Sequence, residues 1–229
     1  MCNLKSNKTL KEILEYKNKL KAINKEGLEL VLFPTSIYLP FFYDVSYKIG
    51  SQTISIYESG NHTGEVLASQ LKSMKISYVL VNHFEAKETF ENIILKIKNA
   101  TKENIRVVLC VGEKNRQTMD ETIVEVKKEV KKIFTKLTSK EIENIVLAYE
   151  PCWAINEKYD INTKVIDNIA EKLKKEIHKS YNFTLPILYG GGITTNNIKD
   201  LAKLDNIDGY LLGNCANNPE NICKVFEIL

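Results

Sequence analysis

Short apolar runs recur along the chain, separated by longer segments in which apolar residues alternate with lysine and glutamate. A short apolar run bounded by polar or turn residues is typical of a strand buried on both faces of a parallel sheet. The pattern predicts eight such strands, at about residues 1–4, 28–33, 49–54, 78–81, 105–110, 145–148, 186–189 and 207–212.

Between the predicted strands, apolar residues recur at helical spacing. The first helix carries them at Leu10, Ile13, Leu14 and Leu20. Its N-cap is predicted at Ser6–Asn7, because short polar side chains there can accept backbone N–H groups. Further helices are predicted at about residues 63–74 and 120–136, from 162–163 onward, and from 219 onward.

Eight strand-then-helix units of about thirty residues fill the 229-residue chain without a linker or a change in composition. Units of this kind close into a (β/α)8 barrel of roughly 250 residues, so we predict an α/β fold with one barrel domain over residues 1–229. A doubly wound sheet is the alternative, but it would normally show a phosphate loop at its first turn. Neither G-x-G-x-x-G nor G-x-x-x-x-G-K-[ST] occurs, which favours the barrel.

Composition argues against several classes of protein. The net charge is only +3, and lysines alternate with glutamates as on solvated helix faces, so no nucleic-acid partner is expected. There is neither a long apolar run nor a signal peptide, so we expect no membrane partner and a cytoplasmic location. The five cysteines lack paired metal-ligand spacing, which favours a reduced protein.

Polar residues stand at the C-terminal ends of five predicted strands, and these ends meet on one face of a barrel. They are Asn3, Lys5, Gln52, His83, Glu85, Glu113 and Glu150. Lysine, neutral histidine and a carboxylate around one pocket suit proton abstraction beside a carbonyl, because two of them can stabilise the enediolate oxygen. Read singly, Lys5 could be a surface residue, His83 a core histidine, and Glu150 a carboxylate satisfied by a helix N-terminus.

Glycine-rich turns follow the last two predicted strands, at Gly190–Gly192 and Gly213–Asn214. Barrels build phosphate sites there from backbone N–H groups, and glycine lets the backbone approach the anion closely. A triple glycine alone usually marks only a turn. Together with the polar strand ends, the turns predict a small phosphorylated carbonyl compound as substrate.

Seven motifs, in this order and spacing, resemble those of the triosephosphate isomerase family over essentially the whole chain. They are Asn3–Lys5, Asn61–Glu65, Asn82–Lys87, Cys110–Glu113, Ala148–Asn156, Tyr189–Gly192 and Asp208–Asn214. The match to A-Y-E-P-x-W-A-I-G, from Ala148 to Ile155, is the most specific of the seven.

The resemblance implies a role for each strand-end residue. Glu150 would be the base, neutral His83 the electrophile, and Lys5 the cation that balances the substrate's charge. Asn3 would add a polar contact and Glu85 would position Lys5. The resemblance also implies a phosphate site, drawn from Asn156, Gly191, Gly192, Gly213 and Asn214.

The resemblance further implies a lid from Pro151 to about Tyr159, a homodimer in which the Thr63 loop inserts beside the neighbour's active site, and no metal or organic cofactor. Loops of this family are known to exclude water when they close.

The chain departs from the family at several of these motifs. Within G-H-S-E-R-R, which Asn82–Lys87 matches in part, Phe84 replaces a serine that holds the base in its open position, and Ala86 replaces an arginine of a buried ion pair. The fourth loop is therefore expected to be held differently. Asn156, Gly192 and Asn214 replace Gly, Ser and Gly, which is expected to weaken or reshape the phosphate grip without removing it, because the contacts are mainly backbone N–H groups.

Three functions compete. The first is an active isomerase interconverting dihydroxyacetone phosphate and glyceraldehyde 3-phosphate in glycolysis and gluconeogenesis. The second is a catalytically weak paralogue that binds phosphosugars as a regulatory or structural dimer. The third is another phosphate-binding barrel enzyme, such as a synthase or epimerase. The joint presence of Asn3, Lys5, His83 and Glu150 favours the first.

Overall fold

A computed structural model describes residues 1–21, 23–155 and 162–229. It contains one eight-stranded sheet in which every neighbouring pair is parallel and the strands follow one another in chain order. The strands are β1 (Cys2–Asn3), β2 (Val31–Phe33), β3 (Lys48–Ser51), β4 (Tyr78–Val81), β5 (Arg106–Val111), β6 (Ile145–Tyr149), β7 (Ile187–Tyr189) and β8 (Gly209–Tyr210).

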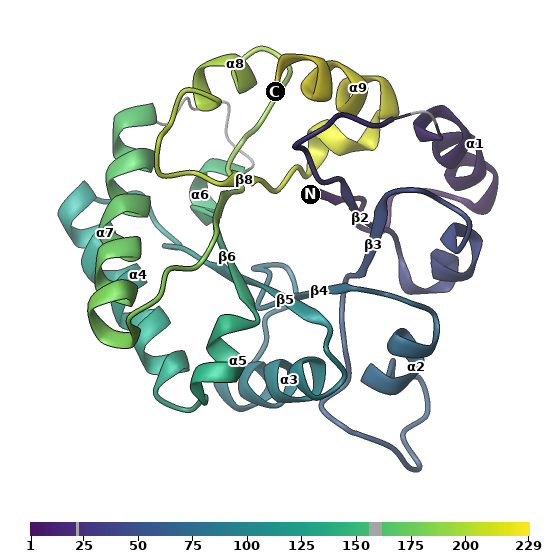
Figure 1. Cartoon of the computed structure of the whole chain (residues 1–229), viewed down its shortest axis with the longest axis horizontal. Coiled ribbons are helices and arrows are strands. Elements are labelled where there is room, and N and C mark those ends of the chain that lie inside the picture. Colours follow the sequence, from purple (N-terminus) through teal and green to yellow (C-terminus); the bar gives the residue numbers. More distant parts are fainter. Residues whose placement is uncertain (22, 156–161) are drawn as a thin grey trace.

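The sheet curls until its last strand meets its first. An isolated parallel bridge joins Cys2 to Leu212, and the N–H of Asn3 donates to the Leu212 carbonyl at 2.9 Å. Figure 1 shows the strands as a ring, with the N-terminus beside the junction and the C-terminus farther out, among the surrounding helices. The predicted (β/α)8 TIM barrel is confirmed.

Helices surround the ring of strands (Figure 1). The α-helices are α1 (Leu10–Leu20), α2 (Ala68–Ser73), α3 (Phe90–Lys102), α4 (Met119–Phe134), α5 (Ser139–Glu143), α6 (Cys152–Ile155), α7 (Thr163–Tyr181), α8 (Ile198–Leu201) and α9 (Pro219–Ile228), and two 3-10 helices are η1 (Ser36–Phe42) and η2 (Asn214–Asn217). Within the ranges that the structure describes, none of the helices has the length and apolarity needed to cross a membrane.

Two predicted helix starts are wrong, each for a local reason. The N-cap of α1 is Thr9, not Ser6–Asn7, because Thr9 and Glu12 form a reciprocal capping box. The helix predicted from residue 63 begins only at Ala68, and Gly64 before it has a φ of +91°, which a right-handed helix does not allow.

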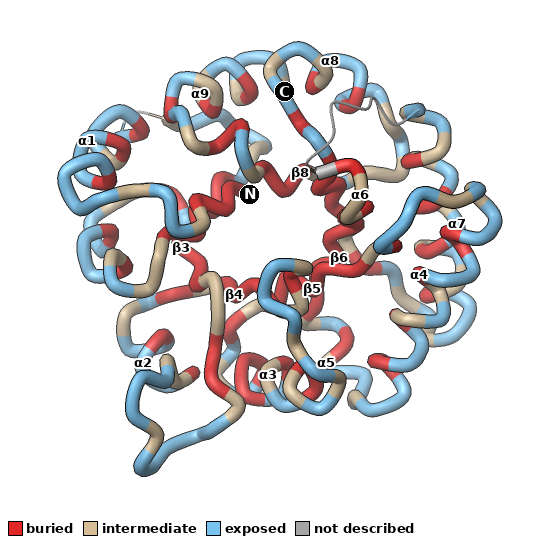
Figure 2. Tube along the Cα trace, turned by 180° about the vertical axis from the view of Figure 1, so that it is seen from behind, coloured by how far each residue is buried: buried red, intermediate tan, exposed pale blue. Residues whose placement is uncertain are grey.

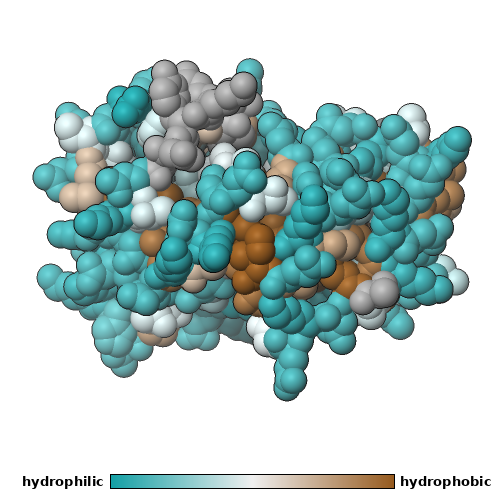
Figure 3. Space-filling view, turned by 90° about the horizontal axis from the view of Figure 1, so that it is seen from above, coloured by the Kyte–Doolittle hydropathy of each residue, from teal (hydrophilic) through white to brown (hydrophobic). Residues whose placement is uncertain are grey.

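The strands bury their side chains on two faces. One face forms a cluster of alternate residues, among them Phe33, Leu80, Val108 and Ala148, which fills the inside of the barrel. The other face packs against the surrounding helices. In Figure 2 the buried positions follow the inner ring while the outer loops and helix faces are exposed. The α8–α9 side in Figure 3 is mostly hydrophilic, with an apolar patch near its middle.

Candidate active site

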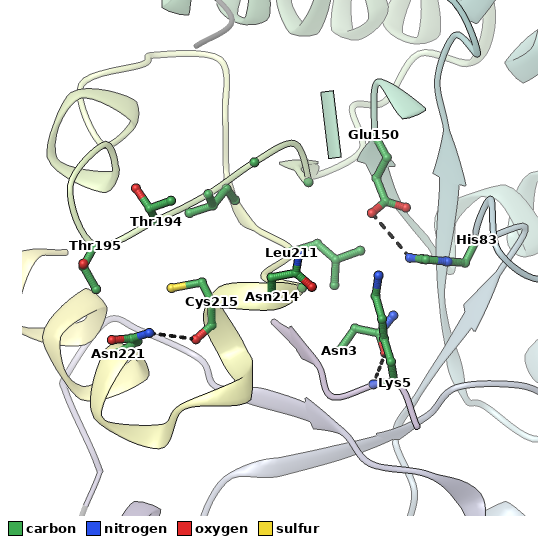
Figure 4. A pocket seen from close by; sticks show the side chains of 14 residues that line it. Asn3, Lys5, His83, Glu150, Thr194, Thr195, Leu211, Asn214, Cys215 and Asn221 are labelled. Atoms are coloured by element: carbon green, nitrogen blue, oxygen red, sulfur yellow. Dashed lines mark hydrogen bonds and ion pairs between the residues drawn. The ribbon is translucent and has the colours of Figure 1, made fainter. Parts of the chain in front are cut away.

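A pocket of about 460 Å³ opens where the strands end. It brings together four predicted residues from three strand ends, Asn3, Lys5, His83 and Glu150, which lie at one end of the pocket in Figure 4. The turns after β7 and β8 line its other end. The pocket therefore combines titratable groups with exposed backbone, as a site for a small charged ligand requires.

Glu150 follows β6 and is only 5% exposed. Its Oε2 has no hydrogen-bond partner in the described part of the chain. Burial raises the pKa of Glu150 to about 7, against smaller lowering effects of the Cys110 thiol and of Lys5. A Cβ at Gly190 would lie 2.6 Å from Cγ of Glu150, so glycine is required there to leave room for the carboxylate. Glu150 thus has the affinity for protons that a general base near neutral pH needs.

His83 follows β4, with its Nε2 3.7 Å from Oε1 of Glu150. Burial lowers its pKa, partly opposed by the nearby Glu85 carboxylate, so the ring is neutral at physiological pH. The backbone N–H of Glu85 donates to Nδ1 of His83 at 3.4 Å. This bond assigns the ring proton to Nε2, which leaves an N–H donor directed into the pocket.

Lys5 lies just beyond β1 in a left-handed conformation with φ of +50°. Its backbone N–H donates to Oδ1 of Asn3 at 3.0 Å, and its carbonyl accepts from Thr35 and Gln52, both at 2.9 Å. Its Nζ pairs with Oε1 of Glu85 at 2.6 Å. These contacts hold an unfavourable backbone conformation in place, which aims the ammonium group into the pocket.

Glu113, just after β5, is buried and is not among the residues that line the pocket. Its carboxylate accepts the indole N–H of Trp153 at 2.8 Å and the hydroxyl of Tyr149 at 3.2 Å. The guanidinium of Arg116 lies 5.5 Å from the Trp153 ring centre. Glu113 therefore anchors the segment that leaves β6, and residues 156–159 of the predicted lid lie outside the described residues.

The predicted phosphate residues divide into three groups. Gly192, Gly213 and Asn214 line the pocket, and Asn214 begins η2. Gly191 instead lines a neighbouring groove beside α8. Asn156 lies outside the described residues. The Nδ2 of Asn197 donates to the Gly192 carbonyl at 3.0 Å and stabilises this turn, in which Gly192 has a φ of +55°.

Sequence reasoning missed several residues that line the pocket beyond the turns, namely Thr194, Thr195, Leu211, Cys215 and Asn221 (Figure 4). None stands directly at the end of a predicted strand, so the strand-end rule does not find them. Their nearness to Gly192 and Gly213 in the sequence was the available signal.

Thr63 lies apart from the pocket, exposed in a loop between β3 and α2 that Figure 1 shows projecting from the barrel. Two rings in the loop, Tyr57 and His62, stack with their centres 3.5 Å apart. The loop is thus locally ordered and faces outward, available for contact with another molecule. Among the described residues, no three His, Cys, Asp or Glu side chains cluster as metal ligands do.

The whole chain, residues 1–229, matches the sequence model of the family described as Triosephosphate isomerase. The chain belongs to the triosephosphate isomerase family. It is 30% identical to the triosephosphate isomerase of Dictyoglomus turgidum over 97% of this chain and 96% of that protein. It is 33% identical to that of Buchnera aphidicola subsp. Cinara cedri over 80% of this chain and 75% of that protein. The resemblance seen in the motifs is confirmed, and the chain is an isomerase of this enzyme family.

Two departures from the triosephosphate isomerase motifs have visible consequences. Phe84 offers no hydroxyl to the base; its ring lies 4.8 Å from that of His83. At the position of Ala86 no arginine is available, and nearby Glu88 pairs with Lys96 at 2.5 Å, both largely buried. The second oxygen of Glu88 accepts the N–H of Asn82 at 3.0 Å, so this pair holds the start of the fourth loop.

Proposed function

We propose that the protein interconverts dihydroxyacetone phosphate and D-glyceraldehyde 3-phosphate through an enediolate. The observation that carries the proposal is the approach of a buried, proton-binding carboxylate, Glu150, to a neutral imidazole, His83, at 3.7 Å. Membership of the triosephosphate isomerase family and the glycine-rich turns that line the other end of the pocket support the same substrate.

In the proposed reaction Glu150 removes a proton from the carbon next to the carbonyl group. The electron pair moves to the carbonyl oxygen, where the Nε2–H of His83 and the ammonium of Lys5 stabilise the negative charge. Glu150 then returns the proton to the former carbonyl carbon. At the same time the hydroxyl on the first carbon gives up its proton and the former carbonyl oxygen takes one up, a transfer that Nε2 of His83 can relay, so the hydroxyl oxygen becomes the new carbonyl oxygen. The substrate and the product have the same atoms and the same number of electrons, so the reaction steps can proceed with the chain's own residues.

The phosphate group would bind at the turns after β7 and β8. Gly192, Gly213 and Asn214 line the pocket there, and backbone N–H groups of such turns can bind an anion. Asn3 would contact the substrate beside Lys5, and Glu85 would hold Lys5 through its 2.6 Å ion pair. In Figure 4 Thr194 and Asn214 lie away from the carboxylate of Glu150, on the side of the pocket where the phosphate would bind.

The first prediction concerns pH. Glu150 must be ionised to accept a proton, and burial raises its pKa to about 7. We therefore expect log kcat/KM to fall with a slope of about one as pH decreases below about 7. His83 does not cause the onset of this fall near pH 7, because burial lowers its pKa below the ordinary value of 6.5. A pH–rate series that stays level down to pH 5 would contradict the assignment of the base.

We also propose a homodimer assembled through the Thr63 loop. Exposed apolar side chains near η1 support a protein partner, since Ile37 is 70% and Tyr43 86% exposed. Thr63→Arg is expected to convert the dimer to a monomer in light scattering, because an unpaired charge would enter the interface. The same substitution at exposed Thr184 is the control and should leave the dimer intact. A monomeric mass for the unmodified protein would rule out the assembly.

The function itself is tested by coupling product formation to an aldehyde-oxidising enzyme. Turnover of dihydroxyacetone phosphate that falls at least tenfold in His83→Gln supports the proposal. Binding of a phosphate analogue without turnover would instead identify the weak paralogue considered above.

A further inference from the structure

A carboxylate from an outer helix lies behind the candidate active site and ties two strand ends together. Oε1 of Glu129, on α4, accepts a hydrogen bond from Nδ2 of Asn82 at 3.2 Å. The backbone N–H of Gly112 also bonds to Glu129. Asn82 directly follows β4 and Gly112 directly follows β5, so one side chain fixes the spacing of neighbouring strands at the pocket.

Asn82 connects Glu129 to the backbone that precedes the imidazole of His83. It has a left-handed φ of +62°, and the next residue is His83. Its Nδ2 also donates to the carbonyl of Cys110, on β5, at 2.8 Å. Together with the Glu88 bond to its backbone N–H, these contacts hold Asn82 from three sides. The direction in which His83 leaves β4 is set by them.

Gly112 connects Glu129 to the backbone of the proposed base, Glu150. A Cβ at Gly112 would lie 2.1 Å from the carbonyl oxygen of Glu150, so the two backbones are in direct contact. The N–H of Glu150 also donates to the carbonyl of Val111 at 2.8 Å. The end of β5 therefore fixes the backbone position of Glu150. Glu129 in turn fixes the distance between the end of β5 and Asn82.

Glu129 is a poor candidate for a second base. Its carboxylate is used by Asn82 and Gly112. Glu129 and Glu150 line a common cavity of only about 70 Å³, too small for the substrate that the main pocket would hold. Burial raises the pKa of Glu129, and the Asn82 amide is the largest influence lowering it, so the two side chains depend on each other.

We propose that Asn82 and Glu129 are positioning residues that set the separation of His83 and Glu150. The inference rests on the proposed roles of those two groups. The family motif has glycine where this chain has Asn82, and glycine has no side chain with which to make the tie. The hydrogen bond between Asn82 and Glu129 is therefore a feature of this chain and not of the family motif. It lies at the start of the loop in which Ala86 replaces the family's arginine.

The test compares kcat and KM in four variants. Asn82→Gly keeps the left-handed backbone accessible but removes the amide, and we expect kcat to fall about tenfold while KM stays within about twofold, since small misplacements of reacting groups are costly. Glu129→Leu removes the carboxylate that accepts the Asn82 amide, and we expect it to cause the same fall in kcat with the same small change in KM. Glu129→Gln keeps an acceptor oxygen and should stay within about threefold of the parent protein. Asn104→Gly, at a φ of +54° elsewhere, is the matched control and should change neither constant.

Ring ¹⁵N signals provide a readout independent of turnover. The chain has only three histidines, so those of His83 can be assigned. They should shift in Asn82→Gly and Glu129→Leu and stay in place in Asn104→Gly. Parental kcat with unshifted His83 signals in both variants would overturn the inference, as would a loss of kcat that only follows the folded fraction. A fully active His83→Gln would instead remove the proposed function itself.

Discussion

Replacing Glu150 with glutamine is expected to lower kcat about 10³-fold and at the same time to stabilise the fold. The loss of activity follows because an amide cannot accept the substrate proton. The gain in stability follows because the folded protein holds a carboxylate whose pKa is raised by burial from 4.5 to about 7. A group of this kind binds more protons in the folded than in the unfolded state between those values, so the free energy of unfolding decreases as pH rises through that window.

The expected gain depends on pH in a way that can be measured. Above pH 7 the ionised Glu150 lowers the free energy of unfolding by up to about 3 kcal/mol, because its pKa is about 7 in the folded protein and 4.5 in the unfolded chain. This cost is absent in the glutamine variant. Below pH 4.5 both side chains are neutral and the difference should vanish. Urea unfolding at about pH 3.5 and pH 8 measures both limits, with exposed Glu143→Gln as the control. If Glu150→Gln is less stable than the parent protein at pH 8, burial of the ionised carboxylate does not destabilise the fold.

Replacing Lys5 with methionine is expected to lower kcat/KM about 10²- to 10³-fold while leaving the fold intact. The ammonium group is the only cation among the residues that line the described pocket, and the enediolate and phosphate both carry negative charge. Methionine keeps most of the aliphatic stem. The Glu85 left without its partner is 47% exposed, so water can solvate it at little cost to stability.

The control for Lys5→Met is Lys11→Met, which removes a lysine from the exposed face of α1. It should leave kcat/KM unchanged, and circular dichroism should be the same for both variants. Retention of parental turnover by Lys5→Met would refute the role of Lys5. Recovery of activity by added alkylammonium ions would support it, since such ions can enter the space that the side chain vacates.

The fold was predictable because its signal is local and repeated. Strands buried on both faces produce continuous apolar runs, and β4 was predicted with its observed bounds, Tyr78–Val81. The ends of elements were less predictable where two caps compete. At the start of α1 both Ser6–Asn7 and Thr9 are possible, and only the reciprocal bond with Glu12 decides between them.

The candidate site was predictable as far as the strand ends supply it. Asn3, Lys5, His83 and Glu150 all follow strands, and barrel closure brings them together. The supporting contacts were not predictable. Gln52 and Thr35 hold Lys5 across 47 and 30 positions of the chain, and Glu129 reaches Asn82 across 47. Such pairs depend on the relative placement of distant elements, which a single sequence does not encode in any local pattern.

The most direct measurement is the conversion of dihydroxyacetone phosphate in D₂O, followed by proton NMR. The account predicts that glyceraldehyde 3-phosphate forms much faster than in buffer alone and that part of it carries deuterium at carbon 2, because the proton held by Glu150 exchanges with solvent before it is returned. Glu150→Gln should lose this conversion. Conversion no faster than in buffer alone, or conversion that survives unchanged in Glu150→Gln, would contradict the account.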